Sequence, residues 1–269
     1  MSAAASPLIA VDIGNSRVKC GRFAAGAIAP AGALPTPQAT CDLGPNSSEL
    51  SHLGDWLGAG EARRAHWCIG SVERTVAARL VDWLREQGAE QIVLLAAGDL
   101  PLEVALPRPD MVGIDRLLGA VAANQLRRPD TPAIIVDLGT AITVDLVTAE
   151  GRFAGGAILP GIGLSARALH EHTDLLPLLD MHELADAPPA LGTDTRAAMR
   201  AGIYWGSIGA VRQLIEQLGS GLSTRPQVIL TGGAAPAVAS RIADAAVYAP
   251  HLVLGGIALA AGRLTSGPS

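Results

Sequence analysis

Two short stretches of this chain combine residue types that could handle phosphate. An apolar run ending in Asp-x-Gly-(Asn/Thr) occurs as "LIAVDIGNS" at residues 8–16 and again as "IIVDLGTAI" at residues 134–142. A glycine two residues after the aspartate lets the backbone approach a ligand, and successive turn N–H groups can then surround phosphate oxygens. Asp12 and Asp137 would repel phosphate unless a cation such as Mg²⁺ lies between, and Lys19 could add a positive charge. The pair favours phosphate binding over two aspartates that only cap tight turns.

A third stretch, "MVGIDRLLGAVAAN", could supply a base and a substrate clamp. Asp115 lies at the expected start of a helix, where the helix dipole favours an ionised carboxylate. Such a carboxylate can accept a hydroxyl proton late in phosphoryl transfer, a step in which positioning matters more than basicity. Arg116 could hold the carboxylate of an acidic substrate. A capping aspartate beside a solvated arginine explains the same residues equally well.

Other catalytic motifs are weak or missing in the sequence. The G-x-G-x-x-A pattern at residues 161–166, with Asp180 downstream, matches the loose dinucleotide fingerprint. Pro160 and the glycine pair at 155–156 make a poor buried parallel strand, which disfavours that interpretation. There is no G-x-x-x-x-G-K-(S/T), no G-x-S-x-G and no H-E-x-x-H, so P-loop kinases, esterase-type serines and zinc proteases of that kind are disfavoured.

The bulk composition limits the partners. The 269 residues carry a net charge of −5 and no long basic run, which argues against nucleic acid or an anionic membrane as the main partner. Cys20, Cys41 and Cys68 show no C-x-x-C spacing, as expected for a reducing compartment without a cysteine metal site. The N-terminus lacks a basic start, and no apolar run reaches about 18 residues. We expect a soluble, cytoplasmic protein.

These motifs need strands and helices to position them, and the pattern predicts an α/β fold in two similar halves. Half of the residues are hydrophobic but only 3% are aromatic, as in tightly packed α/β proteins. Each half begins with a strand, an Asp-x-Gly turn and a returning strand, then continues into mixed helices and strands. A Pro/Gly/Ser-rich stretch near 30–47 predicts a surface connection. The break at 127–132 suggests two domains, residues 1–130 and 131–269, with a ligand cleft between them.

The further elements follow from apolar periodicity and turn signals. Strands are expected at 63–71, 91–97, 133–147 (two strands), 152–159 and 226–233. Helices are expected at 72–88, 114–127, 163–173, 194–218 and 251–264.

Taken in order, the motifs resemble the type III pantothenate kinase family, a branch of the actin, sugar-kinase and heat-shock-chaperone superfamily. The segments that carry the resemblance are "DIGNSRVK" (12–19), "GIDR" (113–116), "DLGTAITVD" (137–145), "GGAILPG" (155–161), "TDTRAAMRAGI" (193–203) and "LTGG" (230–233). The resemblance implies two ribonuclease-H-like domains with a nucleotide cleft between them. It also implies ATP-dependent phosphorylation of pantothenate to 4'-phosphopantothenate, the first step of coenzyme A biosynthesis.

The resemblance implies site residues by position. The ATP-binding residues would be Asp12, Ile13, Gly14, Asn15, Ser16, Arg17, Val18, Lys19 and Thr140. The substrate-binding residues would be Gly113, Ile114, Asp115, Arg116 and Thr195. Asp115 would be the catalytic base, Asp137 would bind a monovalent cation (K⁺ or NH₄⁺), and residues 230–233 would lie near the nucleoside. The family uses Mg²⁺ with ATP and is homodimeric, with the pantothenate pocket at or near the subunit interface.

Two departures from the family pattern leave alternatives open. Ser16 replaces the usual Thr but keeps the hydroxyl. The Tyr that usually precedes the Gly-x-Asp-Arg motif is missing, because no Tyr occurs before Tyr204, so one substrate contact is absent or replaced. A kinase of the same fold acting on another small alcohol is therefore the second hypothesis. A non-catalytic regulatory or accessory protein that keeps the fold is the third.

Overall fold

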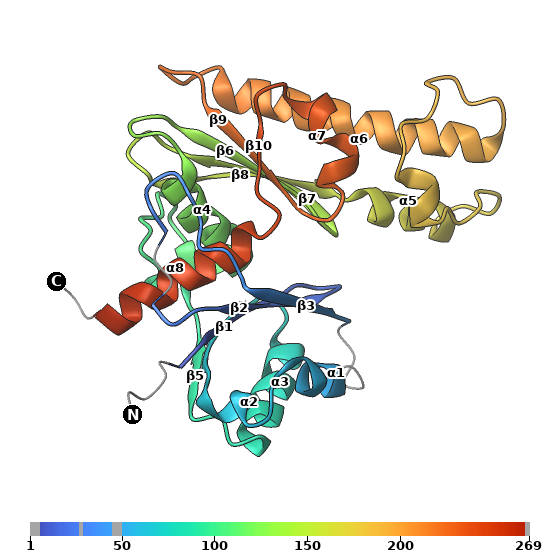
Figure 1. Cartoon of the computed structure of the whole chain (residues 1–269). Coiled ribbons are helices and arrows are strands. Elements are labelled where there is room, and N and C mark those ends of the chain that lie inside the picture. The colour runs from blue at the N-terminus through green and yellow to red at the C-terminus, as the bar shows by residue number, and fades with distance from the viewer. Residues whose placement is uncertain (1–5, 27–28, 45–49, 267–269) are drawn as a thin grey trace. The chain divides into compact units, whose positions relative to one another are not determined.

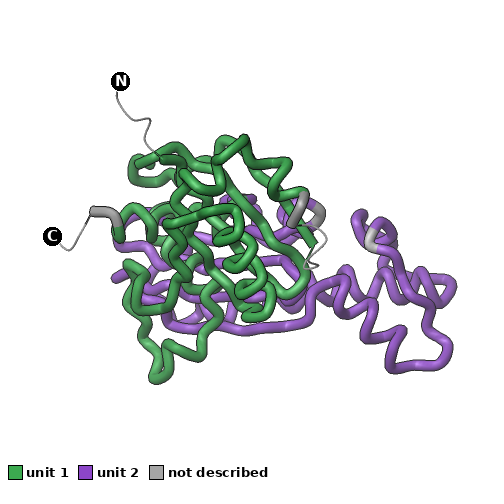
Figure 2. Tube along the Cα trace, turned by 90° about the horizontal axis from the view of Figure 1, so that it is seen from below, with its two compact units in different colours: residues 1–126, 251–269 green, residues 127–250 purple. Residues whose placement is uncertain are grey.

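Two five-stranded sheets organise the chain (Figure 1). The computed structural model describes residues 6–26, 29–44 and 50–266. The chain divides into two compact units, Met1–Leu126 with His251–Ser269, and Arg127–Pro250 (Figure 2). The division near residue 126 is close to the boundary expected from the sequence. The C-terminal segment, however, belongs to unit 1 and not to the second domain in which the sequence placed it.

Unit 1 is built on a mixed sheet with the strand order β3-β2-β1-β4-β5, in which β1 pairs antiparallel with β2 and parallel with β4. Its strands are β1 (Leu8–Ile13), β2 (Val18–Phe23), β3 (Ala39–Leu43), β4 (His66–Ser71) and β5 (Gln91–Leu94). Its helices are α1 (Leu50–Trp56), α2 (Glu61–Arg64), α3 (Arg74–Glu86), α4 (Ile114–Leu126) and α8 (Leu252–Ser266), with short 3₁₀ turns at Ala97–Asp99 and Pro109–Met111.

Unit 2 repeats this topology. Its strand order is β10-β9-β6-β7-β8, and β6 pairs antiparallel with β7 and parallel with β9, as β1 does with β2 and β4. Its strands are β6 (Ala133–Leu138), β7 (Ala141–Val147), β8 (Phe153–Pro160), β9 (Gln227–Thr231) and β10 (Val247–Tyr248). Its helices are α5 (Ile162–Glu171), α6 (Thr195–Gly219) and α7 (Ala235–Ile242), with a 3₁₀ turn at Met181–Leu184. The duplicated α/β organisation expected from the two Asp-x-Gly turns is confirmed.

Helix α8 explains why the C-terminal segment joins unit 1. It packs against α4 and against β1, β2 and β4. A side chain at Gly256 would overlap the backbone carbonyl of Leu118, so glycine lets α8 and α4 approach closely. The apolar pattern of this segment predicts a helix but does not say which sheet the helix covers.

Two further expectations are changed by the strand pairing. The Pro-rich stretch near 30–47 is not only a connection, because β3 lies within it and pairs with β2; residues 45–49 are outside the described part of the chain. Strand β8 lies at the edge of its sheet and runs antiparallel to β7. The G-x-G-x-x-A pattern at 161–166 therefore does not follow a parallel strand, and the dinucleotide interpretation is excluded. Across the described residues, no helix combines the length and apolarity that crossing a membrane would need.

Candidate active site

The first Asp-x-Gly turn closes a tight hairpin in unit 1. Asp12 is the penultimate residue of β1, is only 9% exposed, and lies directly opposite Lys19 of β2. Gly14 donates its N–H to the carbonyl of Arg17 at 3.0 Å, which fixes the turn. Facing residues of an antiparallel pair point to the same side of the sheet. A carboxylate and an ammonium group therefore flank the same turn.

The Gly113–Arg116 segment lies at the same end of the unit 1 sheet. The N–H of Val72, just after β4, donates to the carbonyl of Ile13 at 3.0 Å. A Cβ built on Gly113 would lie 3.6 Å from Cγ1 of Val72. Val72 thus bridges the end of β1 and the start of α4. The structure brings together the two groups of site residues that the sequence placed in the first half.

A glycine in β4 sets the position of α4. A Cβ on Gly70 would lie 2.6 Å from Cδ1 of Leu118 and 3.8 Å from Cγ2 of Ile114. Because Gly70 lacks that atom, the first turns of α4 pack directly on the strand. The helix can therefore begin beside the turn that follows β1.

The carboxylate of Asp115 is held in a folded-back conformation. Its Oδ1 accepts a hydrogen bond from the N–H of Arg116 at 2.8 Å, in the first turn of α4, where a negative charge is favoured. A Cβ on Gly113 would lie only 2.5 Å from the same oxygen. The glycine of Gly-x-Asp-Arg therefore has a steric purpose, because it leaves room for the carboxylate.

The second Asp-x-Gly turn has the same position in unit 2. Asp137 is the penultimate residue of β6 and faces Thr143 of β7, and Gly139 donates its N–H to the carbonyl of Ala141 at 3.1 Å. Two glycines from other strands close on this turn. Gly161, after β8, donates its N–H to the carbonyl of Thr140 at 3.0 Å, and a Cβ on Gly232, after β9, would lie 2.5 Å from Oδ1 of Asp137. The motifs "GGAILPG" and "LTGG" thus meet at the Asp137–Thr140 turn.

Thr195 begins the long helix α6. Asp194 caps this helix by accepting the N–H of Ala197 at 2.8 Å. Gly192 lies so close to the first turn that a Cβ there would lie 2.5 Å from Cα of Ala198. Thr195 is exposed, so its hydroxyl can reach a ligand from this helix end.

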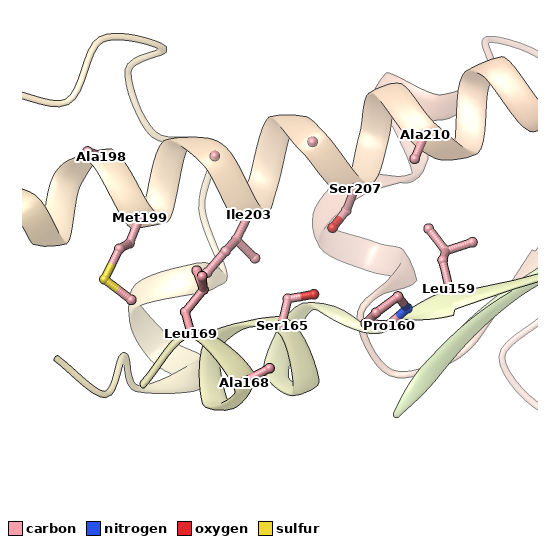
Figure 3. A pocket seen from close by; sticks show the side chains of 12 residues that line it. Leu159, Pro160, Ser165, Ala168, Leu169, Ala198, Met199, Ile203, Ser207 and Ala210 are labelled. Atoms are coloured by element: carbon pink, nitrogen blue, oxygen red, sulfur yellow. The ribbon is translucent and has the colours of Figure 1, made fainter. Parts of the chain in front are cut away.

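A groove of about 710 Å³ lies between α5 and α6 beside the end of β8 (Figure 3). Its α6 wall includes a row of small residues at four-residue spacing, Ala198, Gly202, Gly206 and Ala210, beside the larger Met199 and Ile203. Ser165 and Ser207 bring the hydroxyl groups to an otherwise apolar lining. None of the site residues expected from the sequence lines this groove.

The side chains near the two turns limit which metal ions could bind there. Among the described residues, no group of three or more His, Cys, Asp or Glu side chains could hold a metal. Mg²⁺ is usually bound by one or two carboxylates together with substrate phosphates, so Asp12 or Asp137 fits such a role without a dense cluster. Burial raises the pKa of Cys20 and raises that of Cys68 to about 12. These buried thiols therefore stay protonated near neutral pH and are poor nucleophiles.

The sequence did not reveal the glycines that place the helix starts and the second turn by close approach. Gly70, Gly192 and the role of Gly232 are visible only in three dimensions. Asp145 of β7 is a further buried carboxylate, 1% exposed, and a Cβ on Gly156 of β8 would overlap its Oδ1.

The duplicated fold, with its two Asp-x-Gly turns, defines the broad class of protein. The activator of 2-hydroxyisocaproyl-CoA dehydratase from Clostridium difficile, solved with bound ADPNP, has a similar fold, with a TM-score of 0.51 and 15% identity over 98% of each chain. MreB 5 of Spiroplasma citri, solved with AMPPNP, is similar with a TM-score of 0.52 and 10% identity over 97% of each chain. The chain has the two-domain fold of actin-like and sugar-kinase-like ATPases.

The sequence comparisons identify the family within this class. The family "Type III pantothenate kinase" matches residues 8–217. A type III pantothenate kinase from Gluconobacter oxydans is 36% identical over 81% of this chain and 80% of its own. Another, from Dehalococcoides mccartyi, is 32% identical over 95% of both chains. The chain belongs to the type III pantothenate kinase family.

Proposed function

We propose that this protein transfers the γ-phosphoryl group of ATP to the primary hydroxyl of pantothenate, which yields 4'-phosphopantothenate and ADP in the first step of coenzyme A biosynthesis. The observation that carries this proposal is the match of the family over residues 8–217. The convergence of its motifs on two turns supports it. In the reaction, a bond forms between the hydroxyl oxygen and the γ-phosphorus while the bond to ADP breaks.

In unit 1, residues 12–19 bind the phosphates and Asp115 acts as the base. The buried Asp12 and the facing Lys19 flank the hairpin turn, whose amides and side chains (Asn15, Ser16) offer donors to phosphate oxygens. Asp115 orients the hydroxyl and accepts its proton as the phosphoryl group transfers. The hydrogen bond from the N–H of Arg116 holds the carboxylate in place for this step.

In unit 2, Thr140 contacts ATP and Asp137 binds a monovalent cation, K⁺ or NH₄⁺. The carboxylate of Asp137, which the backbone of Gly232 approaches so closely that a Cβ there would lie 2.5 Å from Oδ1, can offer an oxygen ligand to such a cation. Bound there, the cation would neutralise phosphate charge. Mg²⁺ bound together with ATP would act as a Lewis acid and neutralise phosphate charge.

In this proposal, pantothenate is bound by Gly113, Ile114, Arg116 and Thr195. Arg116 is suited to the substrate carboxylate because its guanidinium can donate two parallel hydrogen bonds. The absence of a Tyr before Tyr204 favours one rival, a kinase of the same fold for another small alcohol. A panel of small alcohols tested beside pantothenate separates the two.

We further propose a cytoplasmic homodimer. Free cysteines fit a reducing compartment, and the groove between α5 and α6 is compatible with a subunit contact through the small-residue face of α6. Light scattering coupled to size-exclusion chromatography checks the dimer. A monomer at micromolar concentration would contradict it.

The test of the function is phosphorylation of pantothenate by the purified full-length protein, with and without K⁺, beside an Asp115→Asn variant. We expect turnover that depends on the cation and falls by roughly 10²- to 10⁴-fold in the variant, the usual contribution of a general base. Folded protein that binds ATP but does not phosphorylate pantothenate would contradict the substrate assignment. Undiminished activity in the variant would contradict the role of Asp115.

A further inference from the structure

Gly161 touches the Asp137–Thr140 turn with its backbone. Its N–H donates to the carbonyl of Thr140 at 3.0 Å. A Cβ at this position would overlap the carbonyl oxygens of Gly139 and Thr140 and lie 2.9 Å from the carbonyl carbon of Thr140. The φ of Gly161 is −68°, a conformation open to any L residue. Glycine is therefore required here by the close approach and not by the backbone conformation.

Gly232 touches the other end of the same turn. Its φ of +95° lies in the region that side chains rarely adopt. A Cβ there would lie 2.5 Å from both Oδ1 of Asp137 and the backbone nitrogen of Leu138. The N–H of Ala234, two residues on, donates to the carbonyl of Leu138 at 3.1 Å. The loop after β9 is thus held against the aspartate proposed to bind the cation.

The atoms that a new Cβ would meet determine which part of the turn must move after substitution. At Gly161 they are backbone atoms, which cannot rotate away as the tip of a side chain can, so the turn itself must shift. At Gly232 they include both the backbone of Leu138 and the carboxylate of Asp137. The two perturbations therefore act on different functional groups of one turn.

We propose that Gly161 and Gly232 are positioning residues for the kinase reaction: Gly161 holds Thr140 for ATP, and Gly232 holds Asp137 for the monovalent cation. This inference rests on the proposed roles of Thr140 and Asp137. It assigns a function in the reaction to two glycines that contact neither reacting group. It also predicts that substituting Gly161 weakens the binding of ATP, whereas substituting Gly232 weakens the binding of the cation.

The chain offers two matched controls for the Gly→Ala substitutions. Gly156 lies within β8, whereas Gly161 follows that strand, and a Cβ at Gly156 would overlap the carbonyl of Val144 and Oδ1 of Asp145. Gly156→Ala therefore strains β8 against β7 without touching the Asp137–Thr140 turn. A Cβ at Gly221 would meet nothing within 4 Å, and its φ is not left-handed, so Gly221→Ala controls for the substitution itself.

The experiment measures ATP and cation binding in the full-length variants. For Gly161→Ala we expect the ATP dissociation constant from calorimetry and the KM for ATP to rise roughly 10- to 100-fold, with the KM for pantothenate within about twofold of the wild type. For Gly232→Ala we expect K⁺ affinity to fall roughly 10- to 100-fold, as when an outer-shell partner of a metal ligand is lost. The readout without turnover is the rise in melting temperature when K⁺ replaces tetramethylammonium, which Gly232→Ala should reduce.

Several results would overturn the inference. One is an equal rise in the KM for ATP in Gly156→Ala, because strain in β8 would then explain the effect. Another is unchanged ATP affinity in Gly161→Ala while Thr140→Ala weakens ATP. If instead Thr140→Ala binds ATP like the wild type, or Asp137→Asn keeps the full K⁺ response, the proposed role of that residue fails.

A measurement on the wild type keeps the inference testable if Gly161→Ala does not fold. We expect ATP to slow hydrogen exchange at the N–H of Gly161, which is bonded to the carbonyl of Thr140. The N–H of Thr148, bonded to the carbonyl of Arg152 in the hairpin of β7 and β8, is the reference and should not change. Equal behaviour of the two amides would refute the coupling.

Discussion

Replacing Gly113 by alanine tests whether the placement of Asp115, the proposed base, controls the rate. The new Cβ would lie 2.5 Å from Oδ1 of Asp115, whereas such contacts essentially never fall below 3.0 Å. The carboxylate must therefore move by about 0.5 Å or more. Because a misplacement of about 1 Å can cost about 10²-fold in rate, we expect kcat to fall roughly 10- to 100-fold. This corresponds to about 1.4–2.7 kcal/mol in the activation barrier.

The same geometry predicts that the variant stays folded. The atom in the way is the end of a flexible side chain and not backbone, so the carboxylate can rotate without disturbing α4. We expect the melting temperature and the KM for ATP to stay close to those of the wild type. The assay is steady-state phosphorylation of pantothenate, with Gly98→Ala as the control, since a Cβ at Gly98 meets nothing within 4 Å.

A double-mutant cycle isolates the mechanism. If Gly113→Ala acts through Asp115, it should cost little further activity in an Asp115→Asn background, because the two changes affect one group. A folded Gly113→Ala variant with kcat within twofold of the wild type would refute the reasoning. Fully additive losses would also refute it, since they would place the effect elsewhere.

Three further predictions concern the supporting structure. Backbone hydrogen bonds at the start of α3 lower the pKa of Glu73 below its usual 4.5, so its stabilising effect is present above that value and is lost as the pH falls. Glu73→Gln should therefore flatten the acid side of the melting-temperature profile below about pH 4.5. Iodoacetamide followed by peptide mapping should label the half-buried Cys41 before Cys68, which is buried and has a pKa raised to about 12; equal labelling would contradict the burial argument. Gly70→Ala should destabilise the protein by about 1–3 kcal/mol in urea unfolding, because the added methyl group would crowd Leu118 at 2.6 Å.

The strands and helices that begin each unit could be predicted because their signals are local. The apolar runs before Asp12 and Asp137 end in turn residues, and both form β-strands of six residues that return as hairpins. The helix beginning near Asp115 was also expected, with an acidic residue in its first turn. These features need only a few neighbouring residues to specify them.

Other features depend on contacts between distant segments. Strand β3 lies in a Pro-rich stretch that is typical of a loop, and it becomes a strand by pairing with β2. The residues at 251–264 were expected to be helical, but their apolar pattern suits either sheet. The close approach at Gly256 and Leu118 decides the matter. Such packing preferences are not visible in the periodicity of one segment.

The duplicated topology gives a physical reason for the different roles proposed for the two Asp-x-Gly turns. Asp12 and Asp137 have the same place in their strands, and each faces a parallel neighbour, Gly70 in one unit and Thr231 in the other. Shortly after Gly70, Val72 links the end of β1 to the start of α4, where Asp115 provides a second carboxylate. After Thr231, the next residue is Gly232, whose backbone closes on Asp137. A turn beside a carboxylate at a helix start suits the proposed proton transfer, and the carboxylate of Asp137, approached by the backbone of Gly232, offers oxygen ligands to the proposed cation. The difference in proposed roles thus follows from what succeeds the parallel strand and not from the Asp-x-Gly motif itself.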